Sequence, residues 1–383
     1  MKLVNSINKQ TRDSGIELLK IFAIFIIVIS HTVQTLTSEN IYVSYSGYVI
    51  NISNATMNIQ RILLQIFFHF GVLGNSIFFM CSAWFLLKSS SWNKKKWFYM
   101  IIEIWTVSII ILIITYIALH GGISRKIIVN SLFPSIFGNN WYMTCYLLFY
   151  PIHSILNDVI NRMNQHQLFR ITLAMIVLYI FMDFINSSWF FSSSIILWIT
   201  IYFAMSYMQK YLMNFADSTK INIFLLFIGC IGFIGIILVT DIGGLYFSFM
   251  SDKVLYWANN CNPFLLAMSL AMFNLARNIH FRKKVVNYIS KLSLLIYIIH
   301  ENIILRTYFR PKMWNYVYEK FGYSYVIEWV FVITLIIFIF GVLSSILYAS
   351  TLQKLVCKVN EKIYKVIKKH YIVFENMMLN SKK

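Results

Sequence analysis

An imidazole and an amine are spaced to lie on one face of the first apolar segment, which reads RDSGIELLKIFAIFIIVISH from Arg12 to His31. Lys20 and His31 share a helical face and are about 16 Å apart along the axis. Lys20 would reach the inner membrane surface and His31 would lie beyond the midplane. Such a deep imidazole can act as a general base toward a hydroxyl or as a transient acyl acceptor. The alternative is structural, with Lys20 as a surface anchor and His31 as a hydrogen-bonded packing residue.

A second ionisable pair interrupts the segment LLIYIIHENIILR, where His300 and Glu301 are neighbours. Ionisable groups are costly in hydrocarbon, so they are functional candidates by default. Adjacent helical residues point about 100° apart, so the two side chains need not contact one ligand. We expect this pair to line the outer, acceptor-side part of a polar cavity. The alternative is an interhelical hydrogen bond that only fixes packing.

Two neighbouring aromatic residues, Trp141 and Tyr142, open another apolar segment. Their rings could stack against a sugar on the acceptor side. An aromatic belt at the membrane interface is the more economical explanation for both.

The segments that must position these residues are those of a membrane protein. The chain has 383 residues, of which 59% are hydrophobic and 12% charged, with a mean hydropathy of +0.67. A soluble protein carries about 25% charged residues. Runs of about 20 apolar residues can cross a bilayer as helices. We predict an all-α integral membrane protein with about ten transmembrane helices, at 16–37, 62–87, 98–119, 141–160, 169–186, 190–208, 221–240, 261–279, 288–308 and 326–351.

The distribution of Lys and Arg predicts the orientation. These residues are concentrated in the loops that face inward if the N-terminus is cytoplasmic, whereas the opposite loops, including 306–325, carry fewer. The positive-inside rule and an even number of spans place both termini in the cytoplasm. The formal charge of +19 is therefore explained mainly by the Lys and Arg that orient the chain in the membrane. It does not indicate nucleic-acid binding.

The chain divides into a multi-pass membrane domain, 1–353, and a basic tail, 354–383. In the tail, lysines and apolar residues alternate at helical spacing, which is typical of a helix on an anionic inner leaflet. A specific protein partner for the tail is the alternative. The five cysteines are scattered and form no CxxC pair, so we expect neither a disulfide framework nor a metal site. No phosphate-binding glycine loop or GxSxG motif occurs.

Four motifs, in order from about residue 12 to 351, resemble the integral-membrane acyltransferase 3 family, in the form found in Gram-positive polysaccharide O-acetyltransferases. The first is the arrangement of Arg12, Lys20 and His31, in which the family usually has arginine where this chain has Lys20. Lysine keeps the positive charge of arginine but lacks its two-pronged guanidinium, so it would bind a phosphate differently. The other three motifs are NSIFFMCSAWFLL, NNWYMTCYLLFYPI at 139–152, and KLSLLIYIIHENIILR.

The resemblance implies transfer of an acetyl group from cytoplasmic acetyl-CoA to hydroxyls of a cell-surface or lipid-linked glycan, in a bacterial plasma membrane. On this interpretation His31, His300 and Glu301 are catalytic, and Trp141 and Tyr142 contact the acceptor. Arg12 and Lys20 bind the donor, with help from Lys94, Lys95 and Lys96 and with Lys20 the more important. We expect acyl-CoA as a substrate and no bound cofactor. The competing hypothesis is a transporter or flippase of a glycan or lipid precursor, although no paired Gly/Pro-interrupted spans suggest inverted repeats.

Overall fold

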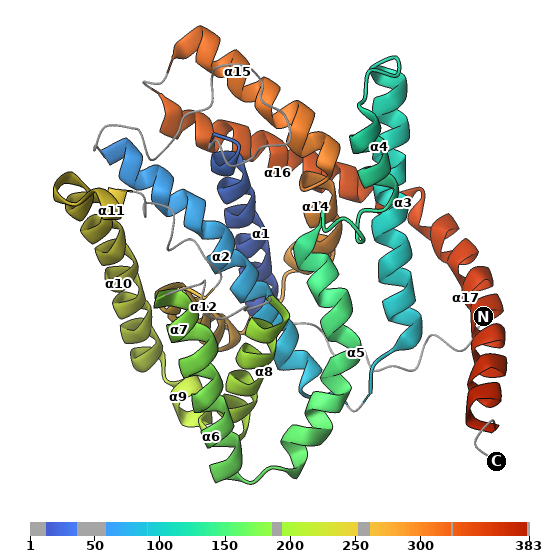
Figure 1. The fold of residues 1–383 in the computed structure, drawn as a ribbon, viewed down its shortest axis with the longest axis horizontal. Coiled ribbons are helices and arrows are strands. Elements are labelled where there is room, and N and C mark those ends of the chain that lie inside the picture. The colour runs from blue at the N-terminus through green and yellow to red at the C-terminus, as the bar shows by residue number, and fades with distance from the viewer. Residues whose placement is uncertain are drawn as a thin grey trace.

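The computed structural model describes residues 13–36, 59–89, 91–185, 194–251, 261–322 and 325–380 (Figure 1). Every regular element in these ranges is helical, which confirms the predicted all-α class. Six helical segments are long and apolar enough to cross a membrane. They are α1 (Ser14–Gln34), α2 (Ile59–Leu86), α3 (Lys94–Ala118), α10 (Thr219–Tyr246), α16 (Val326–Ser350) and the continuous segment Gln165–Ile185, which joins α6 (Gln165–Ile176), η2 (Val177–Phe181) and α7 (Met182–Ile185).

Three further predicted spans correspond to helices that are more polar or shorter than these six. They are α5 (Trp141–Arg162), α8 (Ser194–Tyr211) and α12 (Pro263–Arg277), and α5 carries the polar residues His153 and Asp158. Ten spans and cytoplasmic termini therefore stay predictions. The remaining short helices are α4 (Arg125–Leu132), α9 (Met213–Asp217), α11 (Ser248–Ser251) and α13 (Lys284–Lys291).

The last predicted span, 288–308, is not one continuous helix. The chain forms α14 (Ser293–His300), then a non-helical step at Glu301 and Asn302, then η4 (Leu305–Phe309) and α15 (Arg310–Phe321). The Asn302 side chain accepts a hydrogen bond from the backbone N–H of Ile304 at 3.0 Å. A polar side chain that bonds nearby backbone in this way competes with helix formation. The break allows Glu301 to leave the helical course that the sequence pattern predicted.

Helix α1 lies at the centre of the bundle and packs against α2, α12, α13, α14 and α16. It begins where Asp13 accepts a hydrogen bond from the Gly15 N–H at 3.1 Å, a typical N-cap. At the next residue, the Ser14 hydroxyl donates to Asn287 Oδ1 of α13 at 2.8 Å. These contacts fix the start of α1 against the segment before α14. His31 and His300 are thereby carried on two helices that pack together.

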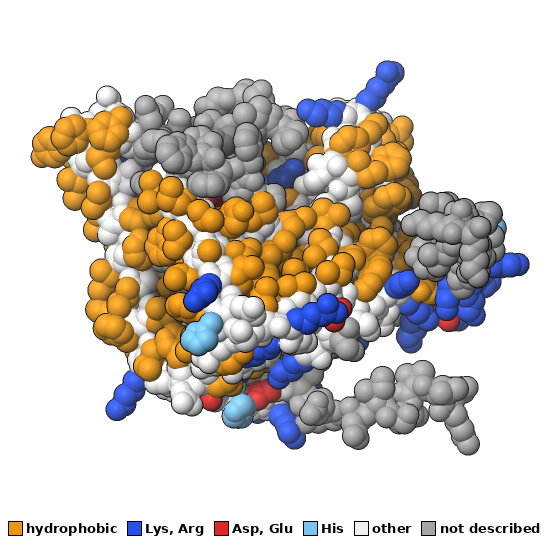
Figure 2. Space-filling model, turned by 60° about the horizontal axis from the view of Figure 1, so that its bottom comes forward, with side chains coloured by type: hydrophobic (Ala, Val, Ile, Leu, Met, Phe, Trp, Pro, Cys, Tyr) orange, Lys and Arg blue, Asp and Glu red, His pale blue; other side chains and the backbone are white. Residues whose placement is uncertain are grey.

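The surface has the character expected of a membrane protein. Figure 2 shows hydrophobic side chains across the middle of one face, with most of the Lys and Arg of that face along its lower side. The last helix, α17 (Gln353–Asn380), follows α16 after a two-residue turn. It packs against α3 through the rings of Phe98 and Tyr364 and an ion pair between Lys95 and Glu361.

Candidate active site

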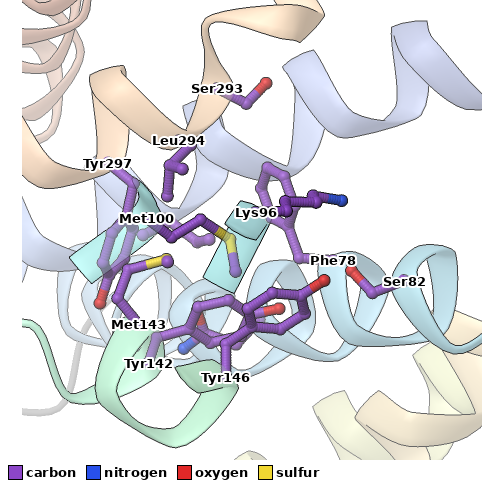
Figure 3. A pocket seen from close by; sticks show the side chains of 12 residues that line it. Phe78, Ser82, Lys96, Met100, Tyr142, Met143, Tyr146, Ser293, Leu294 and Tyr297 are labelled. Atoms are coloured by element: carbon purple, nitrogen blue, oxygen red, sulfur yellow. The ribbon is translucent and has the colours of Figure 1, made fainter. Parts of the chain in front are cut away.

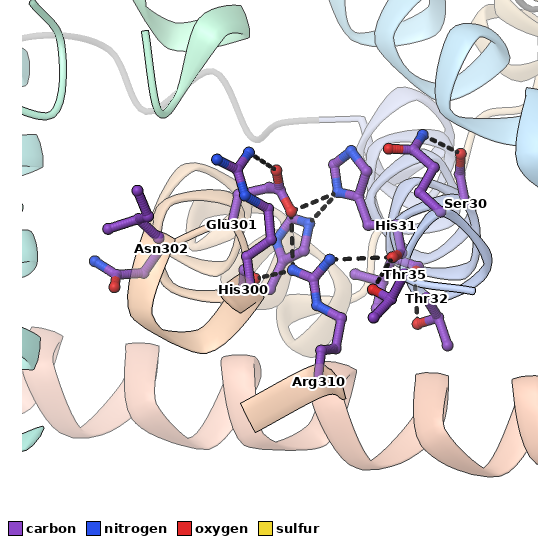
Figure 4. Close-up of polar contacts among 12 residues, drawn as sticks. Ser30, His31, Thr32, Thr35, His300, Glu301, Asn302 and Arg310 are labelled. Carbon is purple, nitrogen blue, oxygen red and sulfur yellow. Dashed lines mark hydrogen bonds and ion pairs between the residues drawn. The ribbon is translucent and has the colours of Figure 1, made fainter. Parts of the chain in front are cut away.

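His31 and His300 meet in the interior of the bundle, together with Glu301 (Figure 4). His31 Nδ1 lies 3.1 Å from His300 Nε2 and 3.1 Å from Glu301 Oε1. The two imidazole rings are stacked, with centroids 5.3 Å apart. Each of the three residues is at most 6% exposed. The structure thus brings together the three residues that the sequence nominated for catalysis, on two helices far apart in the chain.

The hydrogen bonds indicate which imidazole nitrogens carry protons when both rings are neutral. His300 Nδ1 lies 2.9 Å from the Ile296 carbonyl oxygen, which can only accept, so Nδ1 donates and Nε2 accepts. His31 Nδ1 faces two acceptors, His300 Nε2 and Glu301 Oε1, and therefore carries the proton. The lone pair of His31 is then on Nε2. This assignment makes His31 the imidazole that is prepared to accept a proton.

Arg310, from the first turn of α15, holds the carboxylate of Glu301. Its Nη2 lies 2.8 Å from Glu301 Oε1, and the guanidinium also donates to the backbone carbonyls of His31, at 3.1 Å, and His300. Arg306 is a second cation near the carboxylate, with Nη1 3.5 Å from Oε2. Arg310 is 2% exposed. One buried guanidinium therefore ties the ends of α1 and α14 to the carboxylate between them.

Neither arginine stands out in the sequence, because both lie in 306–325, which the hydropathy pattern predicts as an outer loop. The structure describes the start of this segment as helical, and η4 and α15 place Arg310 in the interior of the protein. The four-residue spacing of Arg306 and Arg310 is the signal that could have placed both on one helical face.

Ligand atoms of His31, His300 and Glu301 all lie within 4.8 Å of one another, and two imidazoles with one carboxylate are a suitable donor set for zinc. The contacts present here favour a hydrogen-bond network instead. Arg310 balances the charge of the carboxylate, and a dication would be placed beside that guanidinium. We therefore keep the expectation that the cluster works without a metal.

A cavity of about 230 Å³ shares no wall residue with this cluster but reaches Tyr297, whose ring packs against that of His300 (Figure 3). Its wall includes Lys96 and Met100 near the start of α3, and Tyr142 near the start of α5. The Tyr297 ring forms another part of the wall and lies 5.5 Å from the His300 ring, centroid to centroid. The cavity thus leads from the lysine-rich end of α3 to the residue that contacts His300.

Three polar atoms in that wall, Asn75 Oδ1, Ser293 Oγ and the Tyr297 hydroxyl oxygen, are buried without a hydrogen-bond partner among the described residues. Buried polar groups are normally paired, and an unpaired one raises the free energy of the folded state. Ser82 adds a hydroxyl to the same wall. The cavity therefore offers polar contacts that a bound molecule with amide groups would satisfy.

The other predicted site residues lie in different places. Lys20 Nζ is 3.2 Å from Glu17 Oε1 and 5.9 Å from the centre of the Phe85 ring, and it lines neither the cavity nor the His31 cluster. Trp141 is half-buried and its ring contacts that of Tyr142. Tyr142 lines the same cavity as Lys96, and its contact with an acceptor stays a prediction. Arg12 lies outside the described residues.

Comparison with known proteins gives one match. A family model described as "Acyltransferase domain", that of the acyltransferase 3 group, matches residues 13–350, which include the whole cluster and the cavity wall. No curated protein and no solved structure matches the chain.

Proposed function

The chain belongs to the acyltransferase 3 family of membrane acyltransferases, and from that membership we propose its reaction. The protein transfers an acyl group, acetyl in the simplest case, from cytoplasmic acyl-CoA to a hydroxyl of a cell-surface or lipid-linked glycan. The observation that carries the proposal is the direct contact of His31 Nδ1 with the Glu301 carboxylate, near a largely apolar cavity that has a few polar side chains in its wall.

His31 is the general base in this proposal. An alcohol is a poor nucleophile until its proton is removed, and the free Nε2 lone pair of His31 can accept that proton. The hydroxyl oxygen attacks the thioester carbonyl, a C–O bond forms and the C–S bond breaks. The proton then passes from His31 to the departing thiolate of CoA. Donor and acceptor are thus converted to an ester and a free thiol without any other reactant.

Glu301, Arg310 and His300 are positioning residues. Glu301 fixes the tautomer of His31 and stabilises the imidazolium that forms during transfer, as a carboxylate does in a Ser-His-Asp triad. Arg310 holds Glu301 in place, and His300 keeps the His31 ring oriented by accepting from Nδ1. All three contacts are buried, so they act in an environment of low dielectric constant where they are strong.

The cavity is the proposed path of the donor arm. The pantetheine arm of CoA is long, thin and rich in amides, and Asn75, Ser82 and Ser293 offer polar atoms for such groups. Lys96 would attract the phosphates of CoA at the inner end of the cavity. On this path the main donor-binding cation is Lys96 and not Lys20, which the sequence predicted. Lys96 lines the cavity, whereas Lys20 is paired with Glu17.

The test is acyl transfer by the purified protein in lipid nanodiscs. Radiolabelled acetyl-CoA and cell-wall glycan from the source cell are supplied, and label on the glycan is measured. A transferase moves label to the glycan and releases free CoA in equal amounts. A transporter of glycan precursors, the competing hypothesis, would leave the glycan unlabelled with or without acetyl-CoA.

A further inference from the structure

A second, larger cavity of about 730 Å³ reaches the same histidine cluster from another side. It is a groove between α3, η4, α15 and α16, and its lining includes the His300 and Arg310 side chains. Most other residues of its wall are apolar, from Val107 on α3 to Leu352, just after the end of α16. The groove is therefore a hydrocarbon-like channel that ends on two polar residues of the candidate active site.

The groove opens sideways, toward the surface that faces the membrane. Ile114 on α3 and Ile336, Phe340 and Leu347 on α16 line it, and these side chains are 50 to 64% exposed. His300 and Arg310 are almost fully buried. In a bilayer this side is in contact with lipid chains, so a molecule dissolved in the membrane can enter without crossing water.

We propose that this groove binds the hydrocarbon chain of a lipid-linked acceptor, whose head group then lies beside His300. This inference rests on the proposed acyltransferase function and narrows its acceptor from glycans in general to those on a long lipid chain. Arg310 places its guanidinium, already paired with Glu301, at the polar end of the groove, so a polar head group can lie there while the chain occupies the apolar part. A free, water-soluble sugar would make no favourable contacts with the apolar walls.

The length of the groove supports a long chain. Its lining on the α16 side runs from Ile336 to Thr351, a helical rise of about 22 Å. One leaflet of the hydrocarbon core is about 15 Å thick, so this length exceeds what an ordinary phospholipid chain spans in one leaflet. A polyprenyl chain has the required length.

The groove is also separate from the donor cavity. Ser293, Leu294 and Tyr297 of α14 line the donor cavity, whereas Ile299 and His300 line the groove. The two linings have no residue in common, although Tyr297 and His300 are three residues apart and lie on one face of α14. Donor and acceptor would thus reach the cluster through separate spaces. We therefore assign the groove to the acceptor's chain and not to a long acyl chain on the donor.

Photo-crosslinking tests this assignment without any need for catalysis. The probe is geranylgeranyl monophosphate with a diazirine at its chain end, added to the protein in nanodiscs without acyl-CoA. We expect labelled peptides from the groove-lining parts of α3 and α16, and competition by unlabelled polyprenyl phosphate. Ser344→Trp fills the groove and should reduce this labelling several-fold.

Leu343→Trp is the matched control, because Leu343 is the preceding residue of α16, is exposed, and does not line the groove. Equal labelling of the two tryptophan variants would overturn the proposal, since it would indicate ordinary lipid around the helices. Protection by palmitoyl-CoA but not by polyprenyl phosphate would also overturn it, in favour of a donor acyl chain. If Ser344→Trp reduces labelling and Leu343→Trp does not, while the protein transfers no acyl group, the lipid-binding groove is supported and the proposed function is wrong.

Discussion

Glu301 lies between an imidazole and a guanidinium: its Oε1 is 3.1 Å from His31 Nδ1 and 2.8 Å from Arg310 Nη2. The carboxylate can take this place because α14 ends at His300 and the chain leaves the helix at Glu301. The charge of the pair is buried, so its two partners depend on each other for stability as well as for chemistry.

Replacing Arg310 should therefore destabilise the fold. Arg310→Leu leaves the Glu301 carboxylate buried without its main counter-ion, a change that costs about 3–5 kcal/mol in comparable buried pairs. We expect a clear fall in Tm, measured by tryptophan fluorescence in nanodiscs. The double variant Arg310→Leu with Glu301→Gln should regain part of that loss but no acyl transfer. A double variant that is no more stable than Arg310→Leu would contradict the proposed pairing.

Glu301→Gln tests the orienting role by itself. The amide has nearly the same size, but its NH₂ group can turn toward His31 Nδ1 and favour the wrong tautomer. By analogy with the aspartate of a serine-protease triad, kcat should fall by about 10³- to 10⁴-fold. The KM for acyl-CoA should stay near normal because the residue does not line the donor cavity. Near-normal kcat in this variant would assign Glu301 to packing.

Lys96→Ala should weaken donor binding. Lys96 lines the proposed donor cavity, and loss of its charge should raise the KM for acyl-CoA and make that KM less dependent on salt. Lys95→Ala is the matched control, since Lys95 is exposed and paired with Glu361. Lys20→Ala should have the smaller effect on donor KM. A larger effect for Lys20→Ala would restore the entry path that the sequence first predicted.

The tail helix α17 should lie on an anionic membrane surface. Leu355, Val359 and Ile363 form an exposed apolar stripe, and most of the lysines of α17 lie on a neighbouring face. Hydrogen exchange of residues 354–370 should be slower in nanodiscs that contain anionic lipid than in neutral ones. High salt should reduce the difference. Equal exchange in both lipids would indicate a different partner for this helix.

The sequence predicted the helical class and the residues of the cluster better than it predicted their geometry. Hydrophobic runs identified the long helices, and the cost of burying ionisable groups singled out His31, His300 and Glu301. Their meeting could not be read from local patterns, because His31 and His300 are 269 residues apart in the chain. Arg310 was missed for the same reason: its burial depends on how α15 turns back onto α1.

Helix periodicity also gave the wrong geometry for Glu301. The expectation that neighbouring residues diverge by about 100° applies only inside a continuous helix. The break after His300 lets Glu301 turn toward the same imidazole that His300 contacts. Its signal in the sequence is Asn302, a residue that often ends helices by bonding to backbone.

The central claim, that His31 is the general base, is tested most directly by His31→Ala in purified protein, with His69→Ala as a control. His69 is another buried imidazole, on α2, and has no contact with the cluster. The account predicts that His31→Ala binds acyl-CoA with near-normal affinity, measured by calorimetry, and transfers no acyl group in a single-turnover assay. His69→Ala should transfer at close to the normal rate. Acyl transfer by His31→Ala at a rate similar to that of His69→Ala would contradict the proposed mechanism.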